Sequence, residues 1–500
     1  MVLCFVQPFI TSRTHLPTHI YCAYSHNDCT LLSYPLSHQA VGAPSLDKKR
    51  TEISKMADDS ELHDFDYIQF CAPDFNGIPR GKVVPRKFCG SVLQNGMEMW
   101  NGICVLGPNS EIPFTLDAIN SSHKKHELRP CLETLTPVPR ASRQGRNYGN
   151  VLCDVYMPDG SPDLASPRQL LRAQVNALQQ RHGLLVKAAF EYEFSVFKEG
   201  TLEPVGNNHM QYADMRVWNK HQDIFNDLRE TMQATGVELT SLMPEVGAGQ
   251  WEVTTEPQEG MRGGDVAFHV KNVVKEFFPA RGYQATFMSK VTPDSIPSAL
   301  HLNHSLWVPG QRGEDASSAM FDPTAVDKLS ETARHWIAGV LEHAPAISAL
   351  CSPTLNCYRR LHSQFTPSLI TWGVDNRYTT VRARNAHDNV FLENRLVSGA
   401  ANPYLALAAT VAAGMDGLDR RLKCLPPMDK SQAGELPRNL EKALDALEKD
   451  EELRALLGDR FVKCYVTAKR EYEVVAFHKA APATEDEVFE FDRRLYMNGL

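Results

Sequence analysis

Two glutamates stand two residues apart inside an apolar, strand-like segment, and this pair constrains the fold more than any other feature. Glu191 and Glu193 interrupt the run Lys187-Ala-Ala-Phe-Glu-Tyr-Glu-Phe-Ser-Val-Phe197. Alternate residues of a strand point to the same face, so both carboxylates project together. Neighbouring like charges are unfavourable unless a cation or a base pairs with them. The pair therefore indicates either a ligand site or the solvated face of an edge strand.

Two further segments carry residues of the same kind. The stretch Glu245-Val-Gly-Ala-Gly-Gln-Trp-Glu252 places a glycine-rich turn between two carboxylates, and its strand-like flanks predict a hairpin. Alternation puts His301, Asn303 and Ser305 on one face of another predicted strand. Each segment also has a simpler interpretation, a surface loop for the first and a hydrogen-bonded core histidine for the second.

A fourth segment pairs an acid with fixed cations. Glu393 precedes Arg395 by two residues, a spacing that also suits a same-face salt bridge. Arginines 359, 360, 377 and 382 lie upstream, and arginine suits bidentate contacts with carboxylates or phosphates. Glutamates with one histidine suit hard divalent cations. The chain has neither a Walker A motif nor a dinucleotide glycine fingerprint, which disfavours P-loop and Rossmann folds.

Composition excludes several classes of protein. Of 500 residues, 43% are hydrophobic and 22% are charged, as in ordinary globular proteins. The formal net charge is −8, so no bulk cationic field favours nucleic acid or an anionic membrane as a partner. The apolar stretch Ala400 to Met415 is too short to span a bilayer and predicts a buried helix. Twelve scattered cysteines indicate reduced thiols and a cytoplasmic location.

The sequence divides into three parts. Residues 1–60 are rich in Ser, Thr, His, Pro and Tyr and predict a disordered tail. Residues 61–160 predict a small, mostly β domain of short strands and turns. From residue 161 to 500, strands alternate with long helices, the first running from Gln169 to Arg181 with Pro167 in its first turn. A single amphipathic helix is predicted over Leu440 to Leu457.

The ordered motifs resemble the class I glutamine synthetase family over roughly Asp66 to Leu500. The resemblance is carried by seven stretches: Asp74–Lys82, Phe190–Phe194, Glu245–Glu252, Ala285–Lys290, Asn356–Leu361, Asn376–Arg377 and Ala401–Tyr404. It implies an α+β fold, with an N-terminal β-grasp domain at residues 61–160 and a catalytic-type α/β domain on a curved antiparallel sheet at residues 161–500. It also implies a homo-oligomer, a dodecamer of two stacked hexameric rings.

The resemblance assigns roles to the polar residues. One divalent ion, Mg²⁺ or Mn²⁺, is expected at Glu193, Glu245 and Glu252, and a second, which holds nucleotide phosphates, at Glu191, His301 and Glu393. The arginines divide into a pair that grips glutamate, Arg360 and Arg395, and a pair for phosphoryl transfer, Arg377 and Arg382. Asn303 and Ser305 fall on the nucleotide side. Asn303 replaces a family histidine there, so ATP binding stays open.

Three positions depart from the family pattern. Asn101 stands where the family has the aspartate that binds ammonium, and Phe365 falls at about the position of the flap glutamate. Pro297 replaces a glycine in the loop that approaches the substrate glutamate, and proline lacks an N–H donor. Loss of a positioned base typically lowers a rate by about 10²–10⁴. No catalytic residue of the ammonia site is therefore intact.

From these losses we expect a non-enzymatic member of the family. It resembles a branch with a structural or chaperone-like role in lens fibre cells, in contact with intermediate filament proteins. The alternative is an ATP-dependent γ-glutamyl amide ligase for an amine larger than ammonia, because loss of two anionic residues widens that pocket. A third hypothesis is metal or nucleotide binding without catalysis.

Overall fold

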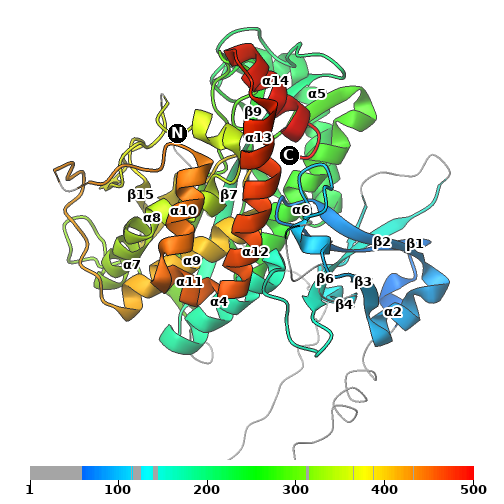
Figure 1. Cartoon of the computed structure of the whole chain (residues 1–500), viewed down its shortest axis with the longest axis horizontal. Helices are drawn as coiled ribbons and strands as arrows, with labels where there is room; N and C mark the ends of the chain where they lie inside the picture. Colours follow the sequence, from blue (N-terminus) through cyan, green and yellow to red (C-terminus); the bar gives the residue numbers. More distant parts are fainter. Residues whose placement is uncertain are drawn as a thin grey trace, which may run out of the picture. The chain divides into compact units, whose positions relative to one another are not determined.

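The computed structural model describes residues 59–113, 115, 125–138, 145–310, 315–363, 365–386, 388–431 and 433–500. The predicted disordered tail lies outside the described residues as far as residue 58. Two β-sheets and the helices that cover them make up the described chain (Figure 1). The predicted mixed α/β fold class is therefore confirmed.

The smaller sheet belongs to the N-terminal part of the chain. Its strands run in the order β2-β1-β6-β4-β3, with β5 beside β6 and the short helix α2 (Cys89–Asn95) packed near β4. β1 pairs antiparallel with β2 and parallel with β6, an arrangement consistent with the expected β-grasp. The domain boundary at residue 160 stays a prediction. The strands are β1 (Tyr67–Pro73), β2 (Pro79–Pro85), β3 (Met97–Trp100), β4 (Lys125–Pro130), β5 (Thr136–Pro137) and β6 (Tyr148–Tyr156).

The larger sheet has the order β14-β15-β16-β12-β7-β9-β8, and its pairs are antiparallel except β14 with β15. The long strand β7 (Leu185–Lys198) contains the predicted strand and also pairs with the short strands β10 and β11. The others are β8 (Leu239–Pro244), β9 (Gln250–Thr255), β10 (Gln258–Glu259), β11 (Tyr283–Thr286), β12 (Leu302–Val308), β13 (Ser317–Ser318), β14 (Trp372–Val374), β15 (Val381–Ala386) and β16 (Asn389–Asn394).

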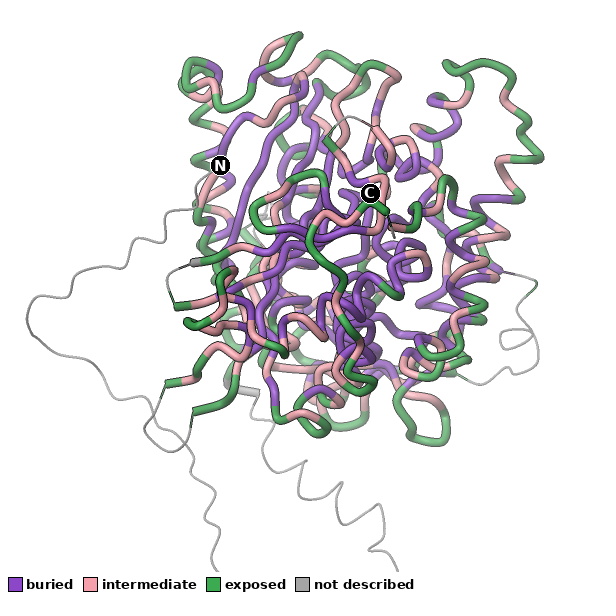
Figure 2. The backbone as a smooth tube through the Cα atoms, turned by 90° about the vertical axis from the view of Figure 1, so that its left-hand side faces the viewer, coloured by how far each residue is buried: buried purple, intermediate pink, exposed green. Residues whose placement is uncertain are grey.

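Helix α9 (Pro403–Asp419) is buried along most of its length, as predicted for this stretch, and it packs against α4, α6, α7, α8 and α11. Figure 2 shows that the buried stretches of the chain gather in the interior and that the exposed ones form turns at its edges. A Cβ atom at Gly339 of α7 would lie 2.2 Å from the carbonyl oxygen of Ala413, so the backbones of α7 and α9 touch. The helices are α4 (Pro167–His182), α5 (Met215–Ala234), α6 (Met261–Phe277), α7 (Glu331–Glu342), α8 (Ala344–Cys351), α10 (Leu440–Lys449), α11 (Glu451–Leu457), α12 (Asp459–Lys469), α13 (Ala476–Ala480) and α14 (Glu485–Tyr496). None of the helices in the described ranges is long and apolar enough to cross a membrane.

The prediction of one helix over residues 440–457 was wrong, because Asp450 divides it into α10 and α11. Asp450 has an extended backbone (φ −77°, ψ 94°), and its Oδ1 atom caps α11 by accepting a hydrogen bond from the Leu453 amide at 3.0 Å. Its Oδ2 atom lies 2.7 Å from Nδ1 of His343. The apolar spacing continues across the break, so periodicity alone does not detect it.

His343 lies buried between two carboxylates, with Nε2 3.0 Å from Oδ2 of Asp416 and Nδ1 bound to Asp450. Burial disfavours the charged imidazole, but the hydrogen bonds and charges of Asp450 and Asp416 outweigh it and raise the pKa of His343. In its protonated form, which this environment favours, His343 ties α8, α9 and α11 together.

We expect His343→Gln to destabilise the chain more at acid pH than at alkaline pH. The pKa of His343 is higher in the folded state than in the unfolded chain, so its stabilisation is complete below the unfolded value and disappears as pH rises through the folded value. Denaturant titrations of both proteins between about pH 5.5 and 9 would measure the difference. A difference in unfolding free energy that stays constant with pH would contradict the assigned charge.

Candidate active site

Strand pairing in the larger sheet brings three predicted ligands together. Glu193 of β7 lies directly opposite Glu252 of β9, and Glu245 follows β8, at the turn that leads into β9. The side chains of Glu193 and Glu252 are buried, and that of Glu245 is partly buried. One carboxylate oxygen from each lies within 4.8 Å of the others. The predicted hairpin thus returns the second carboxylate beside the first.

In the described part of the chain, no arginine or lysine forms an ion pair with the first glutamate group, although the charges of Arg360 and Arg377 act on Glu193 and Glu245. Burial raises the pKa of Glu193 to about 7, and burial together with the charge of Glu193 raises that of Glu245 to about 8. Burial and the charges of four neighbouring glutamates, Glu191, Glu193, Glu245 and Glu393, hold the pKa of Glu252 well above its usual value. Oε2 of Glu245 is buried and has no hydrogen-bond partner in the described part of the chain. Crowded carboxylate oxygens with an unmet lone pair fit a hard divalent cation.

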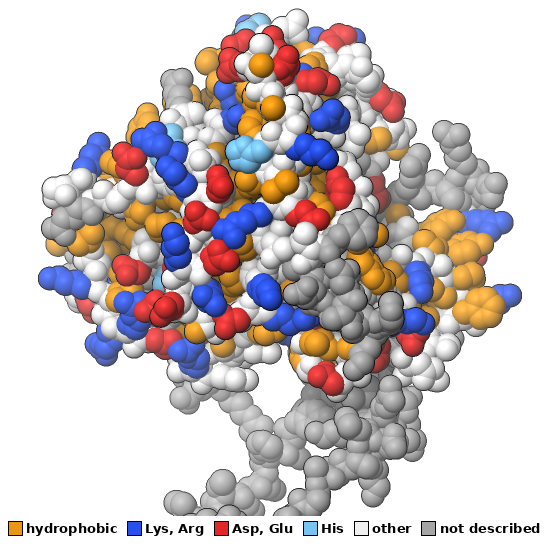
Figure 3. All heavy atoms as spheres, in the orientation of Figure 1, with side chains coloured by type: hydrophobic (Ala, Val, Ile, Leu, Met, Phe, Trp, Pro, Cys, Tyr) orange, Lys and Arg blue, Asp and Glu red, His pale blue; other side chains and the backbone are white. Residues whose placement is uncertain are grey.

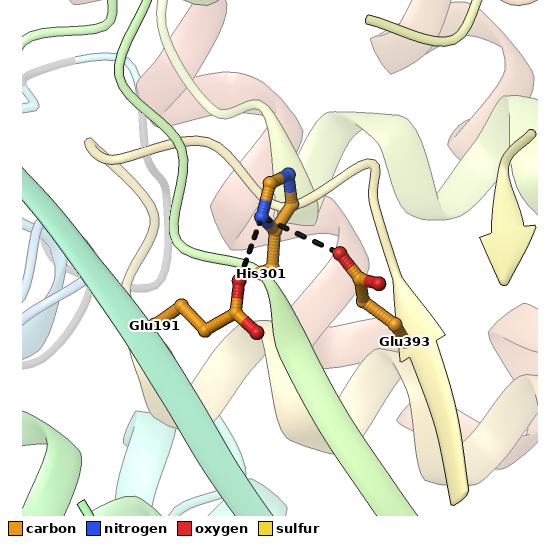
Figure 4. Close-up of side chains that lie close together, drawn as sticks. All are labelled: Glu191, His301 and Glu393. Carbon is orange, nitrogen blue, oxygen red and sulfur yellow. Dashed lines mark hydrogen bonds and ion pairs between the residues drawn. The ribbon is translucent and has the colours of Figure 1, made fainter. Parts of the chain in front are cut away.

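The second predicted group, Glu191, His301 and Glu393, converges from β7, the residue before β12, and β16 (Figure 4). Nδ1 of His301 lies 3.2 Å from Oε2 of Glu191 and 3.5 Å from Oε1 of Glu393. Burial, and then the charge of Arg395, holds the pKa of His301 well below its usual value. The imidazole is therefore neutral at pH 7, the form in which histidine coordinates metals. This donor set also fits a divalent cation.

Three arginines surround the second group. Arg382 and Arg395 both form ion pairs with Glu393, the former at 3.0 Å, so the predicted same-face salt bridge between residues 393 and 395 is present. Arg360 is buried, and its Nη2 donates to the carbonyl oxygen of Arg395 at 3.1 Å. Nη1 of Arg360 and Nε of Arg382 and Arg395 are buried without an acceptor among the described residues. Such unmet donors suit the oxygens of a carboxylate or phosphate.

The remaining predicted residues lie around these groups. Nδ2 of Asn303 donates to Oε1 of Glu191 at 3.0 Å, whereas the Ser305 hydroxyl accepts a hydrogen bond from the Trp307 indole at 2.9 Å. Arg377 is exposed, and its charge reaches Glu245 and His301. Its predicted role in phosphoryl transfer stays a prediction.

The two positions of the predicted ammonia site lie on separate segments. Asn101 directly follows β3 of the smaller sheet, and the neighbouring Ile103 and Cys104 are buried in the core of that sheet. Phe365 is 45% exposed and adopts a left-handed backbone conformation, φ 69°. Two hydroxyls of the same segment, those of Ser363 and Thr366, donate to the carbonyl oxygen of Arg360. The Phe365 segment is thereby anchored to an arginine of the site.

Tyr212 is a candidate that the sequence analysis missed. Its ring is 47% exposed, and its pKa is raised by partial burial and by the charges of Glu245 and Glu252. The phenol therefore lies close to the first glutamate group. It belongs to the irregular segment before α5, where no spacing pattern marks a functional residue.

Gln250 is the second residue that the sequence analysis missed, although it lies within the glycine-rich turn motif. Its Oε1 accepts from the Gly247 amide at 2.8 Å, and its Nε2 donates to the Ser298 hydroxyl at 2.9 Å. The same Nε2 lies 3.2 Å from the carbonyl oxygen of Pro297 and 3.4 Å from Oε2 of Glu193. Gln250 thus joins the hairpin turn, the loop at residues 297–298 and a metal-type carboxylate.

Replacement of this side chain by one of similar size should be costly. Gln250→Leu leaves the buried Gly247 amide without its acceptor, so we expect a loss of about 2 kcal/mol or more in unfolding free energy. The matched control is Gln258→Leu, whose amide contacts only the nearby Glu256 carbonyl and Arg262. Denaturant titration measures both variants, and equal effects would show that the buried contacts of Gln250 contribute nothing special.

The chain is similar to a known protein family and to several of its members. The family model described as "Glutamine synthetase, catalytic domain" matches residues 164–489, more than half of the chain. Human lengsin is 31% identical over 454 residues, which cover 88% of this chain and 85% of lengsin. Glutamine synthetase from Thermus thermophilus is 32% identical over 364 residues, or 69% of this chain and 80% of that enzyme.

Solved structures of similar fold include ligand-bound ones. The crystal structure of a novel glutamine synthase homolog has a TM-score of 0.75 at 28% identity and covers 86% of this chain and 99% of its own. The GmaS/ADP complex has a TM-score of 0.73 at 25% identity and covers 88% of this chain and 98% of its own.

The expectation of a non-enzymatic protein is contradicted by these comparisons. Alongside lengsin, the relatives include glutamine synthetases and a glutamate–isopropylamine ligase from a Pseudomonas species, 28% identical over 85% of this chain and 95% of that enzyme. These relatives, with GmaS in complex with ADP, point to a ligase. The expectation was wrong because the absence of two acidic residues, at Asn101 and Phe365, was taken to mean that the protein has no catalytic activity. The matched residues and the length of shared chain show that this protein belongs to the glutamine synthetase family.

Proposed function

We propose that this protein is an ATP-dependent ligase that joins the side-chain carboxylate of glutamate to an amine, forming a γ-glutamyl amide. The proposal rests on two neighbouring groups of side chains that could each hold a metal ion, called here the metal-type groups: Glu193, Glu245 and Glu252, and Glu191, His301 and Glu393. Three buried arginines beside them each have an N–H donor without an acceptor among the described residues. Members of the family generally use ATP with Mg²⁺ or Mn²⁺. The clustered carboxylates and the neutral His301 fit two such ions, which would neutralise phosphate charge during transfer.

The arginines have a separate task in this reaction. Glutamate must present its side-chain carboxylate to the terminal phosphate of ATP, which forms an acyl phosphate and releases ADP. The amine then attacks the acyl carbon, and the amide forms as phosphate leaves and the amine nitrogen gives up a proton. In this proposal Arg360 and Arg395 hold the glutamate, and Arg382, with Arg377, holds the transferred phosphoryl oxygens. Asn303 fixes one oxygen of Glu191 beside them. The assignment of Asn303 and Ser305 to the nucleotide side is part of this proposal.

We propose that the amine is larger than ammonia. Asn101 and Phe365 carry no charge, so the residues at these positions offer no anion to an ammonium ion. Phe365 instead offers an exposed aromatic surface, and Tyr212 lies near the first glutamate group. An aliphatic amine gains apolar contact with such rings. The relative named glutamate–isopropylamine ligase supports a primary amine with a small alkyl group.

Members of the glutamine synthetase family are typically homo-oligomers, and a dodecamer of two hexameric rings is proposed here. Hydrophobic side chains gather over the smaller sheet (Figure 3), where Val83 and Phe88 are 54% and 56% exposed. An apolar patch of this kind supports a subunit contact. The tail at residues 1–60, the domains at 61–160 and 161–500, the cytoplasmic location and the intermediate filament partner stay predictions.

The ligase assignment is tested by supplying glutamate, ATP and Mg²⁺ or Mn²⁺ to the purified chain with ammonium or a series of primary alkylamines. Mass spectrometry should detect the γ-glutamyl amide of an alkylamine, formed faster than glutamine. Glu252→Gln should lower this rate at least about 100-fold, because it removes a metal-type carboxylate, whereas the exposed Glu256→Gln should not. If no amine gives an amide or releases phosphate, the proposed function is wrong.

Metal binding has its own test, independent of turnover. We expect two Mn²⁺ ions per chain by calorimetry, with Glu252→Gln and Glu393→Gln each losing one. Without metal, Glu252→Gln should raise the melting temperature, because it relieves repulsion among buried carboxylates. With saturating metal the order should reverse, since a ligand bound at 100 times its Kd stabilises by about 2.7 kcal/mol. A variant less stable than the parent in both conditions would contradict the metal assignment.

A further inference from the structure

A cavity of about 400 Å³ lies between the smaller sheet and helices α4 and α6. One wall comes from β1, β5 and β6, and the opposite wall comes from the two helices and the turn after α5. None of the six residues of the two metal-type groups lines it. The cavity is therefore a second site, separate from the candidate active site.

Two buried polar atoms at the cavity wall have no partner among the described residues: Nε of Arg172 and the hydroxyl of Thr136. The guanidinium of Arg172 is held in place, because its Nη2 lies 3.0 Å from Oδ2 of Asp154. An N–H donor that is fixed, buried and unsatisfied is costly, so the site favours an occupant with an anionic oxygen.

The opposite wall offers acceptors. The hydroxyl of Thr235 donates to the carbonyl oxygen of Met232 at 2.7 Å, so it can only accept from Nε2 of His269, also at 2.7 Å. Burial lowers the pKa of His269 to about 4, and the neutral ring therefore carries its proton on Nε2 and keeps Nδ1 as an acceptor. Asn272 uses Nδ2 to donate to Phe268, which leaves Oδ1 as an acceptor.

The positive and negative side chains of the cavity lining are equal in number. Three arginines and three carboxylates line the cavity, and Arg168 is already paired with Asp265 at 2.9 Å. Burial and the charge of Glu276 raise the pKa of the Cys71 thiol to about 12, whereas Arg168 acts on it in the opposite direction. The lining therefore presents both signs of charge, with no formal net charge.

We propose that this cavity binds a free α-amino acid in its zwitterionic form. The carboxylate accepts from Nε of Arg172 and the Thr136 hydroxyl, and the ammonium group donates to Nδ1 of His269 and Oδ1 of Asn272, in the field of Glu276. Apolar wall residues such as Leu152, Val266 and Phe268 receive the side chain. A ligand held from both walls ties the smaller sheet to the helices of the larger part.

The experiment screens the twenty L-amino acids against the full chain by thermal shift and titrates the strongest by calorimetry. We expect one site per chain, and binding at least about tenfold weaker in Thr136→Val and Arg172→Met. Arg181→Met is the matched control on the same helix, because Arg181 pairs with Asp419 and does not line the cavity. The amide and the N-acetyl derivative of the same amino acid should each bind at least about tenfold more weakly, since each lacks one charge.

The outcomes separate this site from the proposed active site. Glu252→Gln should keep the amino acid site, and Thr136→Val should keep any ligase activity. Binding that disappears in Glu252→Gln but survives in Thr136→Val would place the amino acid among the metal-type carboxylates and overturn the proposal. The absence of any shift with all twenty amino acids would also overturn it. If Arg172→Met fails to fold, the amino acid affinity of the nearly isosteric variant Thr136→Val tests the proposal, and unchanged binding in that variant would overturn it.

Discussion

Repulsion among buried carboxylates is the constraint around which the larger sheet is organised. Glu193 and Glu252 face each other across β7 and β9, with Glu191 and Glu393 close by. The strands cannot change register to relieve this repulsion. Phe190, Tyr192 and Phe194 alternate with the glutamates and fill the core on the other face of the sheet. A slip of one residue would turn the carboxylates into the apolar core and the aromatic rings onto the face of the site. The sequence therefore commits the sheet to an arrangement that needs cations.

The protein supplies part of that positive charge itself. Arg382 and Arg395 neutralise Glu393, and backbone and side-chain amides, those of Ala299 and Gln250, reach Glu193. At Glu245 of the first group, Oε2 has no hydrogen-bond partner among the described residues, and the charge of Arg377 acts on this carboxylate without an ion pair between the two. This asymmetry distinguishes a set of structural ion pairs from a site prepared for a ligand, and it supports metal binding more strongly at the first group than residue types alone do.

Residue spacing was enough to predict the parts of the site that lie on strands. Period-two alternation placed Glu191 with Glu193, and the glycines before Gln250 predicted the hairpin that returns Glu252. The contacts of Gln250 with Ser298 and of Asp450 with His343 join residues far apart in the sequence, so no local pattern contains them. The step from the two uncharged positions to a non-enzymatic protein was wrong for another reason. Charge at Asn101 and Phe365 matters for ammonium but not for an apolar amine, and residue identity alone does not say which amine is bound.

The close crossing of α7 and α9 has a consequence for optical measurements. Trp336 of α7 is buried against Gly414, where a Cβ atom would lie 2.2 Å from its ring, and its indole nitrogen donates to Nε2 of His304 at 2.9 Å. His304 belongs to β12, the strand that His301 precedes. The ring has no room to move independently, so its environment changes only when β12 or the helix crossing moves. Trp336, one of the six tryptophans of the chain, therefore makes a contribution to the intrinsic emission that follows the state of that strand.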